Sequence, residues 1–272
     1  MNHRFIFVLL SSVAMLWLAG CQTVQTTGGG TVGVDRAQRM SVSAAQINAA
    51  AEQSYQQTMQ EASAKGILNR DPNVVNRVRA VASRLIPATA AFRADAPGWR
   101  WEINVISSPE INAWCMPGGK IAVYTGLLDK LALSDAELAA VMGHEIAHAL
   151  REHGRERASQ QATQNAVIGV GAAVLGVGQG GASLANIVAQ VTYGLPNSRE
   201  FEREADRMGV ELAARAGYDP RAAITLWQKM AQASGGGGPG FLSTHPTAAD
   251  RITDLQKYAA QVMPIYQSTQ RR

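Results

Sequence analysis

The chain has 272 residues, of which 46% are hydrophobic and 17% charged, a composition that is typical of globular proteins and excludes a largely disordered one. Its formal net charge is +4 and its basic residues are mixed with acidic ones, so we expect no nucleic-acid partner. The length is sufficient for one large hydrophobic core or two small ones.

The first twenty residues are typical of a bacterial signal peptide. Arg4 precedes an uncharged apolar run that extends from residue 5 to residue 20. This run is shorter than the roughly 20 residues that a membrane-spanning helix needs. We therefore expect residues 1–20 to be a signal peptide that is removed from the mature protein.

A candidate lipidation site follows directly. Residues 18–21 (LAGC) resemble the bacterial lipoprotein box, in which cleavage leaves a lipidated cysteine at the new N-terminus. We therefore expect a lipid on Cys21 to attach the protein to a membrane; the alternative is an uncleaved anchor with an incidental cysteine. Gln22 stands where an inner-membrane retention signal usually has Asp. By resemblance to enterobacterial sorting, this favours an outer-membrane lipoprotein that faces the periplasm over an inner-membrane one.

The cysteine count excludes an internal disulfide. If Cys21 carries a lipid, Cys115 is the only other cysteine. No sequence feature marks Cys115 as a nucleophile, so we expect Cys115 to be buried and to pack as a small hydrophobic residue. The fold must therefore depend on its core or on a metal.

The remaining chain is expected to form one domain behind a linker. Residues 21–43 are predicted to be a lipid anchor and a flexible tether, because residues 22–40 are polar and rich in glycine. The folded domain is predicted over residues 44–262, with a C-terminal tail over residues 263–272. Its first helices are predicted over residues 44–64 and 71–85.

A small sheet is predicted next. Residues 101–106, 112–116 and 120–125 have the pattern of strands, and Pro117-Gly118-Gly119 separates the last two. Ser134 and Glu137 then form the pattern of a capping box, which begins the strongest predicted helix, ending near Arg151.

The second half of the chain is predicted to be helical. Residues 158–195 are rich in Ala, Gly, Val and Gln, which favours closely packed helices or a mobile lid near the site. Further helices are predicted over residues 199–216, 220–233 and 247–260, with a glycine-rich run at 235–240. The expected fold class is α+β, mostly α with one small β-sheet.

An H-E-x-x-H motif lies in the capped helix, at residues 144–148 (HEIAH). Residues four apart share one helix face, with roughly 5–6 Å between Cβ atoms, so His144 and His148 can bind one ion. Glu145 is then expected beside the open position of the metal, where it can take a proton from water and give it to the leaving amine. The motif predicts one Zn²⁺ per chain and a catalytic role for Glu145.

A catalytic zinc site needs a third protein ligand. In metzincins the motif continues with Gly and His, but Arg151 and Gly154 occupy those positions, so that class is excluded. His153 is one residue out of register, and we expect it to be a solvent-exposed histidine at the helix end.

Acidic residues on a later helix, within residues 198–209, supply candidates for this ligand. One face of that helix is fully charged and predicts a solvent-exposed surface: Glu200, Glu204, Arg207 and Glu211. Another face carries Glu202 and Asp206 followed by Gly209, whose small size allows close approach of a second helix. Two partly buried acids need a cationic partner. We assign Glu202 as a zinc ligand and Asp206 as the acceptor of a ligand histidine N–H; the alternative is surface acids paired with neighbouring arginines.

These motifs carry a family resemblance. HEIAH, followed some fifty residues later by S-R-x-x-E-x-x-A-D, resembles the HtpX-like and CAAX-prenyl-protease family of zinc metallopeptidases, which have a zincin-like domain of the gluzincin type. In that family the Glu of E-x-x-x-D is the third zinc ligand. The resemblance therefore implies that Glu202 is this ligand and places Asp206 at the last position of the motif.

The resemblance covers roughly residues 70–258 and implies two more parts of the site. Residues 112–128 look like two family strands joined by a Gly-Gly turn, and the edge strand is expected to bind the substrate chain as an added strand at Asn112, Ala113 and Trp114. Residues 244–252 resemble the family's His-Pro element. His245 is then expected either to stabilise the tetrahedral intermediate or to occupy the open zinc position and keep the enzyme latent; the alternative is a turn histidine.

The resemblance implies a zinc endopeptidase of the bacterial envelope, closer to periplasmic lipoprotein members than to multi-spanning ones. Its expected substrates are misfolded or misassembled envelope proteins, and the outer-membrane assembly machinery is a further candidate partner. One alternative is a chaperone-like or scaffolding lipoprotein of outer-membrane assembly with a latent or structural zinc site, although a structural site has no need of Glu145. Another is a zinc hydrolase acting on peptidoglycan or another non-protein substrate.

Overall fold

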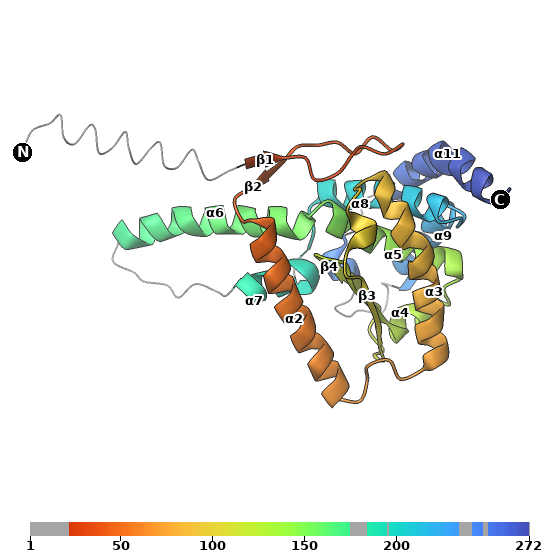
Figure 1. Ribbon diagram of the computed structural model, residues 1–272, viewed down its shortest axis with the longest axis horizontal. Helices are drawn as coiled ribbons and strands as arrows, with labels where there is room; N and C mark the ends of the chain where they lie inside the picture. The colour runs from red at the N-terminus through yellow and green to blue at the C-terminus, as the bar shows by residue number, and fades with distance from the viewer. Residues whose placement is uncertain (1–21, 175–183, 195, 234–240, 247–249, 272) are drawn as a thin grey trace, which may run out of the picture.

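Helices pack against a small mixed sheet in the computed structural model, which describes residues 22–174, 184–194, 196–233, 241–246 and 250–271 (Figure 1). The predictions for residues 1–20, Cys21 and the glycine-rich run 235–240 lie outside this part of the chain. The helices are α2 (Ala44–Ala64), α3 (Pro72–Ala88), α4 (Thr125–Lys130), α5 (Asp135–Leu150), α6 (His153–Val174), α7 (Leu184–Ala189), α8 (Arg199–Arg215), α9 (Ala222–Ala233), α10 (Phe241–Thr244) and α11 (Arg251–Thr269).

The sheet contains the three predicted strands, β3 (Glu102–Ile106), β4 (Ala113–Met116) and β5 (Lys120–Tyr124), in the order β3-β5-β4. β3 is parallel to β5, and β4 is antiparallel to it. β4 is therefore an edge strand, and it packs on α5. The α+β fold class and its mostly helical character are confirmed.

Helix α5 begins as the capping box predicts. The Ser134 hydroxyl accepts a hydrogen bond from the Glu137 backbone N–H, and a Glu137 carboxylate oxygen accepts one from the Ser134 backbone N–H. Almost every residue of α5 is buried, because the sheet covers one side of the helix and α8 and α9 cover others. The H-E-x-x-H motif therefore lies in the interior of the domain.

Two glycines allow α5 and α8 to cross at close range. A methyl group added at Gly209 would lie 2.8 Å from the backbone nitrogen of His144. One added at Gly143 would lie 2.9 Å from the carbonyl oxygen of Gly209. Both distances are too short for a carbon atom, so the crossing requires glycine in both helices. This contact holds the acids of α8 against the histidines of α5.

We expect Gly209→Ala to lower the free energy of unfolding by about 1–3 kcal/mol, because the added methyl group would meet backbone atoms that cannot rotate away. Zinc affinity should fall with it, since the two helices would move apart. Thermal unfolding and zinc titration measure the two effects. Gly98→Ala is the matched control, because a methyl group there meets nothing within 4 Å. Equal melting temperatures for the two variants would contradict this account of the crossing.

The segment predicted to be a flexible tether is packed against the domain instead. β1 (Gln22–Val24) and β2 (Gln38–Met40) form a second, two-stranded sheet, and Val32 and Val34 are buried in the main core. The backbone N–H groups of Thr31 and Val32 donate to the Glu211 carboxylate at 2.8 and 3.0 Å. Glu211, predicted to face solvent, is thus fully buried, because backbone donors of this segment satisfy its charge.

The structure describes parts of two further regions for which the sequence makes predictions, the C-terminal tail and the segment rich in Ala and Gly. The predicted tail over residues 263–272 is mostly helical, since α11 continues to Thr269 and packs Ile265 and Tyr266 against the core. Within residues 158–195 the structure describes α6 and α7, and Figure 1 shows α6 extending away from the sheet. In the described part of the chain, no helix combines the length and the apolar character needed to cross a membrane.

Candidate metal centre

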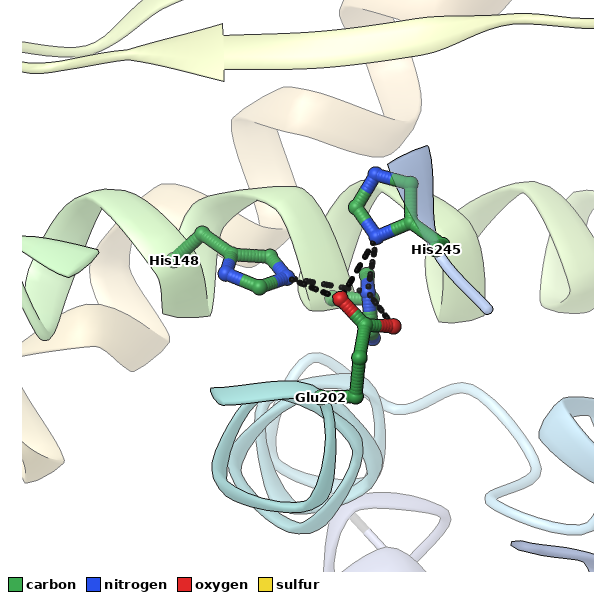
Figure 2. A group of neighbouring side chains, drawn as sticks. His148, Glu202 and His245 are labelled. Carbon is green, nitrogen blue, oxygen red and sulfur yellow. Dashed lines mark hydrogen bonds and ion pairs between the residues drawn. The ribbon is translucent and has the colours of Figure 1, made fainter. Parts of the chain in front are cut away.

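Three elements bring the predicted metal ligands together. α5 supplies His144 and His148, α8 supplies Glu202, and His245 follows the short helix α10. All four side chains are buried, and one donor atom from each lies within 4.8 Å of the others. Figure 2 shows the rings of His148 and His245 and the carboxylate of Glu202 pointing toward one another.

The donor atoms have the spacing of a zinc site. His144 Nε2 lies 3.1 Å from His148 Nε2 and 3.1 Å from His245 Nδ1. Glu202 Oε1 lies 2.9 Å from His245 Nδ1 and 3.4 Å from His148 Nε2. Zinc bonds of about 2.0–2.1 Å in a tetrahedron place neighbouring ligand atoms about 3.3 Å apart. Imidazole nitrogens and a carboxylate oxygen are also donors that zinc prefers, so these residues fit one zinc ion.

His245 is held in this group by its own neighbours. Its ring stacks on Phe241, with the ring centres 4.1 Å apart, and its backbone N–H donates to the Phe241 carbonyl. Its Nδ1 faces the other donors, while its Nε2 lies 3.5 Å from a carboxylate oxygen of Glu145. His245 is therefore a fourth potential ligand, beyond the three that the sequence assigned to the metal.

Glu145 lies beside the donor group without contributing an atom to it. Its Oε1 is buried and accepts no hydrogen bond within the described part of the chain. Burial raises the pKa of Glu145 to about 8, and the nearby Glu202 carboxylate acts in the same direction. Burial alone would also raise the pKa of Glu202, but His245 and His144 hold it well below its usual range. The two carboxyl groups are thereby suited to different tasks.

Asp206 accepts a hydrogen bond from His144 Nδ1 at 2.9 Å. This leaves Nε2 of His144 with its lone pair toward the donor group. Burial lowers the pKa of His144 to about 3, so its ring is neutral near pH 7. The contact is of the kind that the sequence analysis assigned to Asp206.

Sequence analysis gave no role to Arg251, although the His-Pro element at residues 244–252 contains it. Its guanidinium group lies 3.0 Å from Glu202 Oε2 and 2.7 Å from Asp206 Oδ1. It also lies over the ring of Trp227, 3.2 Å from its centre. Arg251 therefore compensates two buried carboxylates at once. Its position six residues after His245 was the available signal.

The prediction that His153 is solvent-exposed is wrong. Its side chain is 2% exposed, its ring stacks on Phe201, and it hydrogen-bonds to His148 and to Glu204. Glu152, which has a positive φ of 51°, lets the chain turn between α5 and α6, and this turn directs His153 back into the domain. Glu204, also predicted to face solvent, is 7% exposed.

The C-terminal end of the edge strand β4 lies next to the metal site. A small pocket over the donor group is lined by Cys115, Pro117, Glu145, His148 and His245, among others. Cys115 is buried as expected, and burial raises the pKa of its thiol. The predicted substrate-binding residues do not line this pocket: Asn112, Ala113 and Trp114 lie earlier along the strand segment, with their side chains buried.

Comparison with known proteins agrees with this geometry. The chain is 40% identical over 154 residues to the mitochondrial metalloendopeptidase OMA1 of Arabidopsis thaliana, a match covering 57% of this chain and 30% of the relative. It is 33% identical over 174 residues to a putative beta-barrel assembly-enhancing protease of Vibrio cholerae, covering 59% and 35%. Identity to the beta-barrel assembly-enhancing protease of Escherichia coli is 27% over 207 residues, covering 73% and 41%.

The chain spans about a third to a half of the length of the curated relatives it matches. Residues 72–259, which carry every proposed metal ligand, match the family model described as "Peptidase family M48". The family resemblance read from the two motifs is thereby confirmed, and with it the use of zinc. The chain carries the metallopeptidase domain of peptidase family M48 and belongs to that family.

Proposed function

We propose that this protein is a zinc-dependent endopeptidase of the bacterial cell envelope, with zinc held by His144, His148 and Glu202 and with Glu145 as the general base. The observation that carries this proposal is the placement of Glu145, whose buried carboxylate oxygen Oε1 accepts no hydrogen bond from the described residues and lies next to a complete set of zinc donors. A site that only stabilises a fold has no use for such a carboxylate.

Bound zinc would supply Lewis-acid chemistry, polarising the scissile carbonyl and making a water molecule more acidic. Glu145 takes the water proton at a carboxylate oxygen and later delivers it to the nitrogen of the leaving amine. Burial raises the pKa of Glu145 above that of an exposed carboxyl group, which makes its ionised form a stronger base toward the water proton. Asp206 meanwhile keeps the His144 ring in the orientation that directs Nε2 to the donor group.

The substrate class follows from the edge strand. β4 ends next to the pocket over the donor group, so a polypeptide added to this edge would lead into the site. Binding of this kind uses backbone hydrogen bonds and therefore requires an unfolded segment. We accordingly propose that Asn112, Ala113 and Trp114 guide an extended substrate chain, and that misfolded or misassembled envelope proteins are cleaved.

The cellular location rests on the sequence of the N-terminus. Relatives include mitochondrial enzymes as well as bacterial ones, so similarity alone does not favour one compartment. The LAGC sequence at residues 18–21 supports a lipid on Cys21, and Gln22 supports the outer membrane with the domain in the periplasm. The Escherichia coli relative is named for the enhancement of beta-barrel assembly, which supports a beta-barrel assembly machinery as a candidate partner; with the lipid on Cys21, this would be the machinery of the outer membrane.

Cleavage of an unfolded protein tests the activity. Purified protein loaded with zinc should digest casein, a chelator should stop the digestion, and added zinc should restore it. Digestion of purified cell wall but not of casein would instead favour the peptidoglycan hydrolase. Zinc binding without cleavage of either would favour the scaffolding lipoprotein with a latent site, which the four-donor arrangement also permits.

His245 is proposed to occupy the fourth donor position and keep the site closed, because its Nδ1 lies among the other donors. We therefore expect His245→Ala to raise the rate of casein cleavage about tenfold. This factor corresponds to a parent protein in which His245 has left the fourth donor position in about a tenth of the molecules, since only these could cleave. Zinc content, measured in parallel, should remain at one ion per chain. A rate that drops about 100-fold or more would instead assign His245 to stabilisation of the tetrahedral intermediate.

A further inference from the structure

The second ring nitrogen of His148 faces a row of buried polar side chains that the proposed reaction does not use. His148 Nδ1 lies 2.8 Å from His153 Nδ1, and His153 Nε2 lies 2.9 Å from Glu204 Oε2. All three side chains are buried. The row therefore begins at a proposed zinc ligand and ends at a carboxylate on α8.

The hydrogen-bonding capacities of these groups restrict how protons can be arranged. An ionised Glu204 only accepts, so His153 Nε2 must carry a proton. The contact between the two Nδ1 atoms needs one proton, on either His148 or His153. If His148 carries it, its Nε2 has a free lone pair, which faces Glu202 Oε1 at 3.4 Å. If His153 carries it and His148 is neutral, the His148 proton is on Nε2, and His148 cannot bind a metal.

Arginines hold Glu204 in place for this arrangement. Arg151, which is fully buried, contacts both Glu204 oxygens at 3.2 Å. Arg36 donates from Nε to Glu204 Oε1 at 2.8 Å and from its other nitrogens to Glu156. A carboxylate paired in this way stays ionised and therefore accepts a hydrogen bond from the Nε2–H of His153. Because Arg36 belongs to the segment between β1 and β2, that segment completes the surroundings of the metal site.

We propose that His153 and Glu204 are positioning residues for His148, fixing its ring orientation and placing its proton on Nδ1 so that Nε2 can bind zinc. This inference rests on the proposed zinc site and deepens it. Asp206 makes the equivalent contact to His144, so each histidine of the H-E-x-x-H motif has its own supporting carboxylate on α8, direct for His144 and through His153 for His148. Supporting contacts of this type hold ligands in their metal-binding form.

Paired substitutions separate this role from a merely structural one. His153→Leu removes the acceptor for the His148 N–H. His153→Asn introduces a side chain of nearly the same shape as leucine, but its amide oxygen can accept a hydrogen bond from His148 Nδ1. Glu204→Gln removes the anchoring charge. Glu211→Gln is its control, since Glu211 is also a buried acid on α8 but contacts Thr31, Val32 and Arg215 instead of a histidine.

Zinc dissociation constants would be measured by competition with a chromophoric chelator, and the visible spectrum of Co²⁺-loaded protein would report ligand geometry. Thermal unfolding of the metal-free protein would report stability alone. His153→Leu and Glu204→Gln are expected to weaken zinc binding about 10- to 100-fold and to change the Co²⁺ spectrum. His153→Asn should restore affinity to within about threefold of the parent, and Glu211→Gln should lower the melting temperature without changing zinc affinity.

Parental zinc affinity in both His153→Leu and Glu204→Gln would overturn the positioning role and leave the proposed zinc site standing. If His153→Leu does not fold, the comparison of Glu204→Gln with Glu211→Gln decides, and equal zinc affinities in that pair overturn the inference. A parent protein that binds no zinc would instead refute the proposed function itself, so the two failures are distinguishable.

Discussion

Glu145→Gln is expected to lower the rate of casein cleavage by about 100- to 10,000-fold, the contribution of a general base, while zinc binding is retained. Glutamine has the shape of glutamate but cannot take a proton from water. Glu145 contributes no atom to the donor group, so its replacement leaves all four donors in place. The substitution also removes a carboxyl group whose pKa burial has raised, so the variant should fold at least as well as the parent.

Cleavage rates and zinc content would be measured on the same preparations. Glu137→Gln is a suitable control because Glu137 is another buried acid on α5, engaged in the capping box and in an ion pair with Lys229. This control should lower the melting temperature and leave the cleavage rate nearly unchanged. Equal rates for Glu145→Gln and the parent would show that another residue acts as the base or that the activity is a contaminant.

Much of the catalytic framework could be predicted because its signals are local in sequence. The capping box at Ser134 identified the start of α5, and the i, i+4 spacing of His144 and His148 identified two donors. The close approach of α8 could be predicted from Gly209, since only a small residue on that face admits a second backbone. This face also contains Glu202 and Asp206, and the structure places both against the histidines.

What could not be predicted depends on contacts between distant parts of the chain. Glu204 and Glu211 form a charged face that resembles a solvent-exposed surface in sequence, yet both are buried. Their charges are compensated by Arg36 and by the backbone of Thr31, which lie more than 160 residues earlier. Because residues 22–40 are polar and rich in glycine, their composition predicts a tether, although specific hydrogen bonds and two buried valines hold this segment in place.

Arg251 illustrates the same limit within the site. A lone arginine in a helix is normally solvent-exposed, and the position of Arg251 six residues after His245 does not by itself indicate burial. It becomes buried because Glu202 and Asp206 present two carboxylates and Trp227 presents an aromatic face. Only the packing of α11 on α8 and α9 creates that environment.

Glu202→Gln is expected to weaken zinc binding more than about 100-fold, beyond the loss caused by removing a supporting contact, and to abolish cleavage. A neutral amide is a poorer zinc donor than a carboxylate. The change also leaves the buried Arg251 paired with Asp206 alone. Zinc content by elemental analysis and dissociation constants by chelator competition would measure the effect. Glu200→Gln is the control: Glu200 lies two residues before Glu202 on α8, and its side chain is 58% exposed. This variant should bind zinc like the parent.

The two variants together distinguish a ligand from a base. If Glu202 binds the metal and Glu145 moves the proton, then Glu202→Gln loses zinc and activity together, whereas Glu145→Gln loses activity alone. If both variants lose zinc equally, Glu145 is itself a ligand, and coordination would explain why its buried Oε1 accepts no hydrogen bond from the described residues. If Glu202→Gln keeps zinc, His144, His148 and His245 must suffice as ligands, and His245 would then be a permanent ligand instead of a removable one. The ratio of zinc loss to activity loss in each variant therefore assigns both carboxylates.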